Sequence, residues 1–427
     1  MPVGLAGSPN ELLQRAFRSY AGERDASAAL IAQKLELLSH YDVPGMQRAV
    51  SICFWSRSGS FLLASYLDSH DHVVLLPTNR SDFTYAFLAE FASLSVWEKL
   101  VAYPAYAQSK LARTGDFFHG DFRIGAADYY AAVRGLYTLY GERPADCLNA
   151  RVRFLQFLFV AYAVAVGRRP GTSRPLIVYG QHYTDDELAK AFVADFPDGR
   201  FIHTIRDPIS ALDSWFDRKM IGEYPPGQYP SPAVETMRDL LTWDRPHRGM
   251  EARTRAIHFE DLHLAPEATM RRVADWLDIP YSPCLIESTY NGAPFVFESG
   301  GVTMLGANPA NARRRSRSLD VADRWLMFAL LHENFRAWGY DCPRVLRYAW
   351  LRLCVIAGLL LIPMKMEVIT ARMLVTHQAL PALRTGRIRH GLGAFAFFLK
   401  RRLRMMLLIA SEARARLTGK KRLLQPL

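Results

Sequence analysis

Two segments about 150 residues apart each combine an apolar run, a small polar turn and a helical pattern. In the first, Val50–Trp55 has the apolar character of a buried strand, Ser56–Ser60 is polar, and a helical pattern begins at Phe61. A strand, a glycine turn and a helix start together present unpaired backbone N–H groups and the positive end of a helix dipole. The segment therefore predicts an anion-binding turn in an α/β fold, in which Gly59 permits close approach and Arg57 adds a permanent charge.

The alternative for this first segment is a plain strand-to-helix turn capped by a serine. Under the anion-binding interpretation, Ser58 and Ser60 supply hydroxyl donors instead. The turn lacks the lysine and the magnesium-binding hydroxyl of the G-x-x-x-x-G-K-[ST] loop. Ordinary ATP or GTP hydrolysis is therefore disfavoured.

The second segment repeats this organisation. Arg200–Ile205 is an apolar run, Arg206-Asp207-Pro208 follows at its carboxyl end, and an apolar helical face continues through Phe216. Proline suits the first turn of a helix. Ser214 lies two turns into that helix, on the side where it can face the same ligand as Arg206. The alternative is a surface Arg-Asp pair that opens a helix.

The combination resembles the sulfotransferase family. Ser56–Leu62 is similar to the family's 5′-phosphosulfate loop, and Arg206-Asp207-Pro208 with Ser214 is similar to its 3′-phosphate motif. A third stretch, from Ile257 to Pro280, resembles a later motif of the family. The resemblance extends over residues 50–341 and implies 3′-phosphoadenosine 5′-phosphosulfate as the donor.

The resemblance also implies a role for each donor-binding residue. It implies that Arg206 and Ser214 bind the 3′-phosphate. It also implies that the 5′-phosphosulfate is bound by Arg57, Ser58, Gly59, Ser60, Phe61 and Leu62. The chain departs from many relatives in having Arg57 in place of lysine, and Phe259 where some relatives have a tyrosine that contacts the nucleotide.

Sulfuryl transfer requires alignment of donor and acceptor, charge stabilisation on the leaving phosphate, and a base for the acceptor proton. Arg57 suits the leaving group, and no metal is required. The 12 histidines and 5 cysteines are dispersed along the sequence, without metal-ligand spacing. His182, at the end of an apolar run, is the first candidate base, and Glu90 is the second. A purely structural role for His182 remains open.

The expected fold is a mostly parallel α/β sheet with helices on both faces, of the P-loop-like type. Residues 83–162 are rich in aromatics and helical in pattern, which predicts a helical insertion in which most aromatics serve packing. The basic run Arg313–Arg317 is similar in placement to a late loop that closes over the donor in sulfotransferases. A solvated basic loop explains it equally well.

Charge is unevenly distributed along the chain. Residues 344–427 contain 17 Lys/Arg and 2 Asp/Glu, a net charge of +15, whereas the whole chain carries +12. We therefore predict a catalytic domain over residues 1–343 and a basic, apolar helical tail over residues 344–427. The apolar runs of the tail are too short for a confident membrane span, but they suit helices on an anionic membrane surface. Packing of these helices on the core or a partner is the alternative.

The N-terminus and the cysteines indicate where the enzyme is located. The N-terminus lacks the pattern of a secretory signal and the cysteines show no pairing pattern, which favours a cytoplasmic enzyme, peripheral on the inner membrane face. No nucleic-acid motif is recognised. The expected reaction is sulfation of a glycan or lipid-linked glycan hydroxyl, of a nodulation-factor or lipopolysaccharide type. The alternatives are a P-loop kinase or nucleotide hydrolase, and a membrane-surface binding protein with a vestigial nucleotide pocket.

Overall fold

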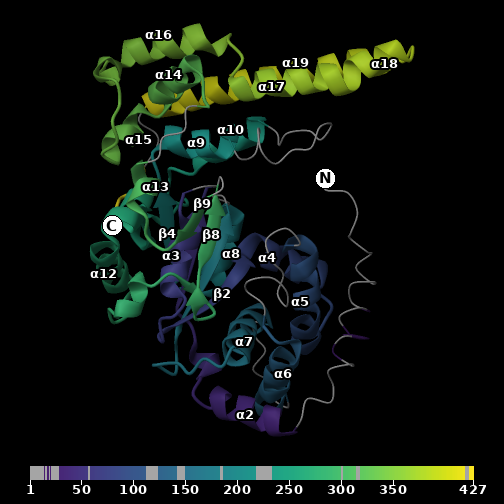
Figure 1. The fold of residues 1–427 in the computed structure, drawn as a ribbon, viewed down its shortest axis with the longest axis vertical. Helices are drawn as coiled ribbons and strands as arrows, with labels where there is room; N and C mark the ends of the chain where they lie inside the picture. Colours follow the sequence, from purple (N-terminus) through teal and green to yellow (C-terminus); the bar gives the residue numbers. More distant parts are fainter. Residues whose placement is uncertain are drawn as a thin grey trace. The chain divides into compact units, whose positions relative to one another are not determined.

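The central element is a five-stranded sheet with helices around it, seen in a computed structural model (Figure 1). The structure describes residues 14, 17–18, 20, 28–55, 58–111, 124–141, 150–182, 186–217, 233–299, 302–313, 318–418 and 423–427. The strand order is β2-β3-β1-β4-β5, and the sheet is mostly parallel. The predicted fold class is therefore confirmed.

The strands of the main sheet are β1 Ala49–Phe54, β2 Val73–Arg80, β3 Leu176–His182, β4 Arg200–Ile205 and β5 Thr254–His258. Two short hairpins pair β6 Thr289–Tyr290 with β7 Ala293–Pro294, and β8 Val296–Ser299 with β9 Val302–Leu305. Strands β1 and β4 are buried almost throughout, although Ser51 interrupts the apolar sequence of β1, and His203 and Thr204 interrupt that of β4.

The chain forms two compact units, and β1 and β4 run from the first into the second. The first unit contains residues 1–53, 59–202 and 261–308. Its helices are α2 Ala28–Leu38, α3 Ser60–Leu67, α4 Ser81–Glu90, α5 Val96–Leu111, α6 Ala126–Tyr140, α7 Ala150–Ala165, α8 Asp186–Asp195 and α12 Pro266–Leu277.

Helices α4 to α7 confirm the helical character predicted for residues 83–162. Their aromatic side chains pack on one another. Phe87 lies 5.3 Å from Tyr103 and 5.1 Å from Tyr106 between ring centroids, and Trp97 stacks on Phe157 at 5.1 Å. Such pairs stabilise a core beyond the area they bury. Packing is thus the role of these aromatics, as predicted.

The second unit contains residues 54–58, 203–260 and 309–427. Helix α11, Phe259–Leu264, begins in this unit. The remaining helices are α9 Pro208–Phe216, α10 Ala233–Thr242, α13 Pro309–Arg313, α14 Val321–Leu330, α15 His332–Ala337, α16 Ala349–Leu360, α17 Lys365–Leu374, α18 Leu380–Arg384 and α19 Ile388–Leu417.

The tail helices share the hydrophobic core of the second unit. Met405 and Ile409 of α19 are fully buried in the same cluster as Trp243, Phe335 and Trp338. The predicted boundary near Cys342–Pro343 falls inside this unit. One face of the tail therefore packs on the core, as the alternative interpretation of the tail required.

The last residues of the chain lie along β5. Ala256 of β5 donates its N–H to Gln425 O and accepts from Leu427 N, both at 2.8 Å, and a parallel bridge joins Ala256 to Pro426. Trp338 Nε1 donates to Leu424 O at 3.2 Å. Strand β5 is an edge strand of the sheet. The short segment therefore pairs with backbone groups on the outer side of an edge strand, which is a side that a sheet otherwise leaves unpaired.

Candidate functional site

The first predicted anion-binding turn joins β1 to α3. Gly59 is the N-cap of α3 and adopts φ 92°, in the left-handed region that favours glycine, and Ser60 is the first helical residue. The cap is therefore a glycine, and the alternative of a serine-capped turn is wrong. The first N–H groups of a helix have no partner within it, so the turn keeps the polarity that suits an anion. Ser56 and Arg57 lie outside the described residues.

Ser58, predicted to contribute a hydroxyl to the donor, makes hydrogen bonds within the protein. Its side chain is buried, and its hydroxyl donates to Trp55 O at 2.7 Å and lies 2.8 Å from Thr204 Oγ1. Trp243 Nε1 donates to Thr204 O at 3.1 Å, which fixes the partner of Ser58 in turn. The hydroxyl of Ser58 thus shapes the turn and ties it to β4, two residues before Arg206.

The second predicted turn is a buried, capped helix start. Asp207 is the N-cap of α9, and its Oδ1 accepts from Ser210 N at 2.6 Å, with Pro208 in the first turn. Arg206 and Asp207 are only 7% and 8% exposed. The alternative of a surface Arg-Asp pair is therefore wrong.

Arg206 packs against an aromatic ring and lies near a carboxyl group. Its guanidinium carbon lies 4.3 Å from the centroid of the Phe259 ring, within the range of a cation–π interaction. Phe259 thus provides packing at the position where a tyrosine was expected in some relatives. Burial raises the pKa of Glu260, while a hydrogen bond of 2.7 Å from Tyr340 and the charge of Arg206 act in the opposite direction.

Helix α9 also anchors the segment after the basic run. Asp213 accepts from Leu319 N at 2.7 Å and from Arg324 Nη2 at 2.6 Å, and Asp217 accepts from Ser318. Ser214, the second predicted 3′-phosphate ligand, is half-buried on the same helix. Four residues of the basic run, 314–317, lie outside the described residues. The chain on their carboxyl side is therefore fixed to the helix that carries Ser214.

The two candidate bases, His182 and Glu90, lie at the ends of different elements. His182 is the last residue of β3, a direct neighbour of β1 in the sheet, and its side chain lies outside the described part. Glu90 is the exposed last residue of α4. The other predicted loop residues differ in exposure, since Phe61 is 45% exposed whereas Leu62 is buried.

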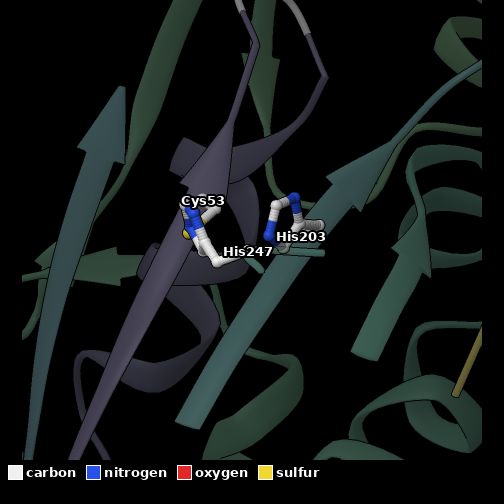
Figure 2. Close-up of side chains that lie close together, drawn as sticks. All are labelled: Cys53, His203 and His247. Atoms are coloured by element: carbon white, nitrogen blue, oxygen red, sulfur yellow. The ribbon is translucent and has the colours of Figure 1, made fainter. Parts of the chain in front are cut away.

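Three of the dispersed cysteine and histidine residues come together in the structure. The candidate ligand atoms of Cys53, His203 and His247 all lie within 4.8 Å of one another (Figure 2). The expectation that the histidines and cysteines stay dispersed is therefore wrong for these three. Burial raises the pKa of Cys53 to about 12 and lowers that of His203, so the neutral thiol and imidazole are favoured here.

Sequence reasoning missed three contributors to this region. Thr204 carried one signal, because it is a hydroxyl residue inside a buried strand. Glu260 stood within the third family motif, but nothing in the sequence indicated its place near Arg206. Trp243 carried no signal, because its contact with Thr204 joins residues 39 positions apart.

A mostly parallel sheet with a glycine turn after one strand and a capped, arginine-bearing turn after its neighbour defines a P-loop-like α/β protein. The sequence model of the sulfotransferase family matches residues 50–283, more than half of the chain. The chain belongs to the sulfotransferase family and is a sulfotransferase enzyme. Members of this family generally use 3′-phosphoadenosine 5′-phosphosulfate as donor.

Several solved structures are similar to this chain at low identity. The sulfotransferase domain of the curacin biosynthetic pathway is 13% identical, covers 69% of this chain and 99% of its own, and has a TM-score of 0.35. The sulfotransferase domain of the Synechococcus PCC 7002 olefin synthase is 17% identical, covers 71% of this chain and 99% of its own, and has a TM-score of 0.36. Sulfotransferase STF9 from Mycobacterium avium is 14% identical, covers 67% of this chain and 87% of its own, and has a TM-score of 0.31. No curated protein matches the chain.

Proposed function

We propose that the chain transfers the sulfuryl group of 3′-phosphoadenosine 5′-phosphosulfate to a hydroxyl of a glycan or lipid-linked glycan. The observation that carries the donor assignment is the 2.8 Å contact between the hydroxyls of Ser58 and Thr204. It holds the residue beside Arg57 next to β4, the strand that ends one residue before Arg206. This contact supports an arrangement in which the two turns approach each other, as a nucleotide with separate 3′- and 5′-anionic groups requires.

In the proposed reaction, the acceptor oxygen forms a bond to sulfur while the bond from sulfur to the 5′-phosphate oxygen breaks. The products are the sulfated acceptor and adenosine 3′,5′-bisphosphate. Arg57, Ser58, Gly59, Ser60, Phe61 and Leu62 form the 5′ loop. Arg57 and the N–H groups at the start of α3 stabilise charge on the leaving phosphate, and Arg206 with Ser214 holds the 3′-phosphate. His182 takes the acceptor proton.

The glycan assignment has weaker and separate support. It comes from the arginine in the loop, the large helical insertion of α4 to α7, and the basic tail with its exposed apolar residues. The last of these supports a location on the inner membrane face, where a lipid-linked glycan would be accessible. A screen of candidate acceptors with radiolabelled donor identifies the acceptor.

Nucleotide preference tests the donor assignment. We expect adenosine 3′,5′-bisphosphate to bind at least about tenfold more tightly than adenosine 5′-phosphate, because charged hydrogen bonds to the 3′-phosphate contribute about 1.5–3 kcal/mol. Isothermal titration calorimetry measures both affinities. Equal affinities contradict the proposal, and magnesium-dependent ATP turnover supports the kinase alternative.

The assignment of the base is tested separately. We expect His182→Ala to lower kcat about a hundredfold, because it removes a general base, while the affinity for the bisphosphate stays unchanged. Glu90→Gln, measured beside it, is expected to keep near-normal turnover. Normal turnover in His182→Ala removes the assignment, and a loss confined to Glu90→Gln transfers the role to Glu90.

A further inference from the structure

Helix α19 carries an apolar stripe that no part of the described structure covers. Its members recur every three or four residues, and each is at least half exposed, from 51% to 62%. They are Ile388, Leu392, Phe395, Leu399, Leu403 and Leu407. At 3.6 residues per turn these positions fall within an arc of about 120°. The opposite flank of the helix, including Met405 and Ile409, is buried in the second unit.

Cationic side chains border this apolar stripe. Arg389, Lys400 and Arg404 are exposed, and helical geometry places them along the edge of the stripe that faces away from the buried flank. An exposed apolar strip with a basic border is the composition of a helix that lies in a membrane interface. Helix α19 is a single helix of 30 residues, which is long enough to lie along a surface.

The charge of the tail identifies the partner. Its only two carboxylates are internally paired, Glu367 with Arg402 at 2.7 Å and Glu412 with Arg416 at 2.6 Å. The net charge of residues 344–427 is +15. Four of the cations in this segment pair with carboxylates outside it: Arg352 with Glu333, Lys365 with Asp320, Arg401 with Glu235 and Arg416 with Asp244. A second copy of the chain would bring the same charge to the contact and be repelled. An anionic bilayer complements both the charge and the apolar stripe.

The alternative of a membrane span does not fit the local structure. Residues 349–384 are long and apolar enough to cross a bilayer by length and composition. However, α16 ends at Leu360 and α17 begins at Lys365, so the helix is interrupted. The 12 residues of α16 extend about 18 Å at 1.5 Å each, which is less than a bilayer core of about 30 Å. Helix α16 alone is therefore too short to cross a bilayer.

We propose that α19 docks the enzyme on an anionic membrane surface, with the apolar stripe inserted among the headgroups and the cationic border against the lipid phosphates. The inference goes beyond the proposed reaction and does not depend on the donor or acceptor. It specifies the face of the protein that meets the lipid.

Vesicle co-sedimentation of the full chain, without nucleotide or acceptor, tests the docking surface. We expect binding to vesicles of phosphatidylcholine with 30 mol% phosphatidylserine, weakening as salt is raised, and little binding to phosphatidylcholine alone. L392Q/F395Q/L399Q and R389Q/K400Q/R404Q should each bind at least about tenfold more weakly. The matched controls V296Q/L305Q and R169Q/R271Q/R272Q change exposed residues elsewhere and should bind like the wild type.

Each of the other outcomes overturns the proposal. Wild-type protein that stays in the supernatant, or a stripe variant that sediments normally, shows that the stripe does not contact lipid. Loss of binding in the charge variant alone indicates a general polyanion surface. A wild-type dimer that becomes monomeric in the stripe variant, by light scattering, indicates an interface between copies. Unchanged bisphosphate affinity and thermal unfolding show that each variant is folded, and separate this test from that of the reaction.

Discussion

Replacing Arg206 by alanine is expected to weaken the binding of adenosine 3′,5′-bisphosphate by about 10²–10³-fold. The guanidinium is 7% exposed and lies against the Phe259 ring, so its loss leaves a desolvated site without its positive charge. Adenosine 5′-phosphate has no 3′-phosphate, and its affinity should change much less. The preference for the bisphosphate should therefore nearly disappear in the variant, as measured by calorimetry with both nucleotides.

Two further variants make the Arg206 experiment specific. Arg206→Lys keeps the charge but loses the planar group that stacks on Phe259, so we expect an intermediate affinity. Arg200→Ala is the matched control. Arg200 begins β4, the strand that Arg206 follows, and its guanidinium carbon also lies near an aromatic ring, 5.4 Å from the Trp276 ring centroid. A bisphosphate preference that survives in Arg206→Ala, or falls equally in Arg200→Ala, contradicts the assignment.

The second large effect is expected at Arg416, where the tail joins the core of the second unit. Arg416 is 5% exposed and pairs with Asp244, which is 2% exposed, and with Glu412 at 2.6 Å. Arg416→Ala leaves the Asp244 charge buried without its cation. We expect a loss of about 3–5 kcal/mol in the free energy of unfolding, measured in urea at neutral pH.

Removing both charges provides the control for this prediction. The double variant R416M/D244L replaces the ion pair with apolar side chains and should be much more stable than Arg416→Ala. Arg271→Ala breaks an exposed pair with Glu267, 2.8 Å apart, and should leave the free energy of unfolding close to that of the wild type. If Arg416→Ala unfolds like the wild type, the ion pair does not hold the tail.

The main parts of the fold could be predicted because their signals are local. Buried parallel strands need continuous apolar runs, and Arg200–Ile205 forms β4 over the predicted residues. The helix start at Pro208 was equally readable, since proline and the preceding aspartate both favour it. The same local signals predicted the helices of residues 83–162.

The parts that could not be predicted depend on contacts between distant residues. A serine in a glycine turn suits a ligand, a helix cap or a strand contact, and only the fold joins Ser58 to Thr204, 146 positions later. The meeting of Cys53 with His203 and His247 had no spacing signal for the same reason. The apolar runs and basic residues of the tail predicted helices, but which face of α19 packs on the core depends on residues of α10, α14 and α16.

The C-terminal segment also constrains how the protein is made. Residues 424–427 pair with Ala256 and receive the indole hydrogen bond of Trp338. This segment is synthesised long after β5, so the second unit lacks the partner of that strand until residues 424–427 have been made. Truncation of the chain before Leu424 should therefore yield misfolded protein rather than a shortened active enzyme.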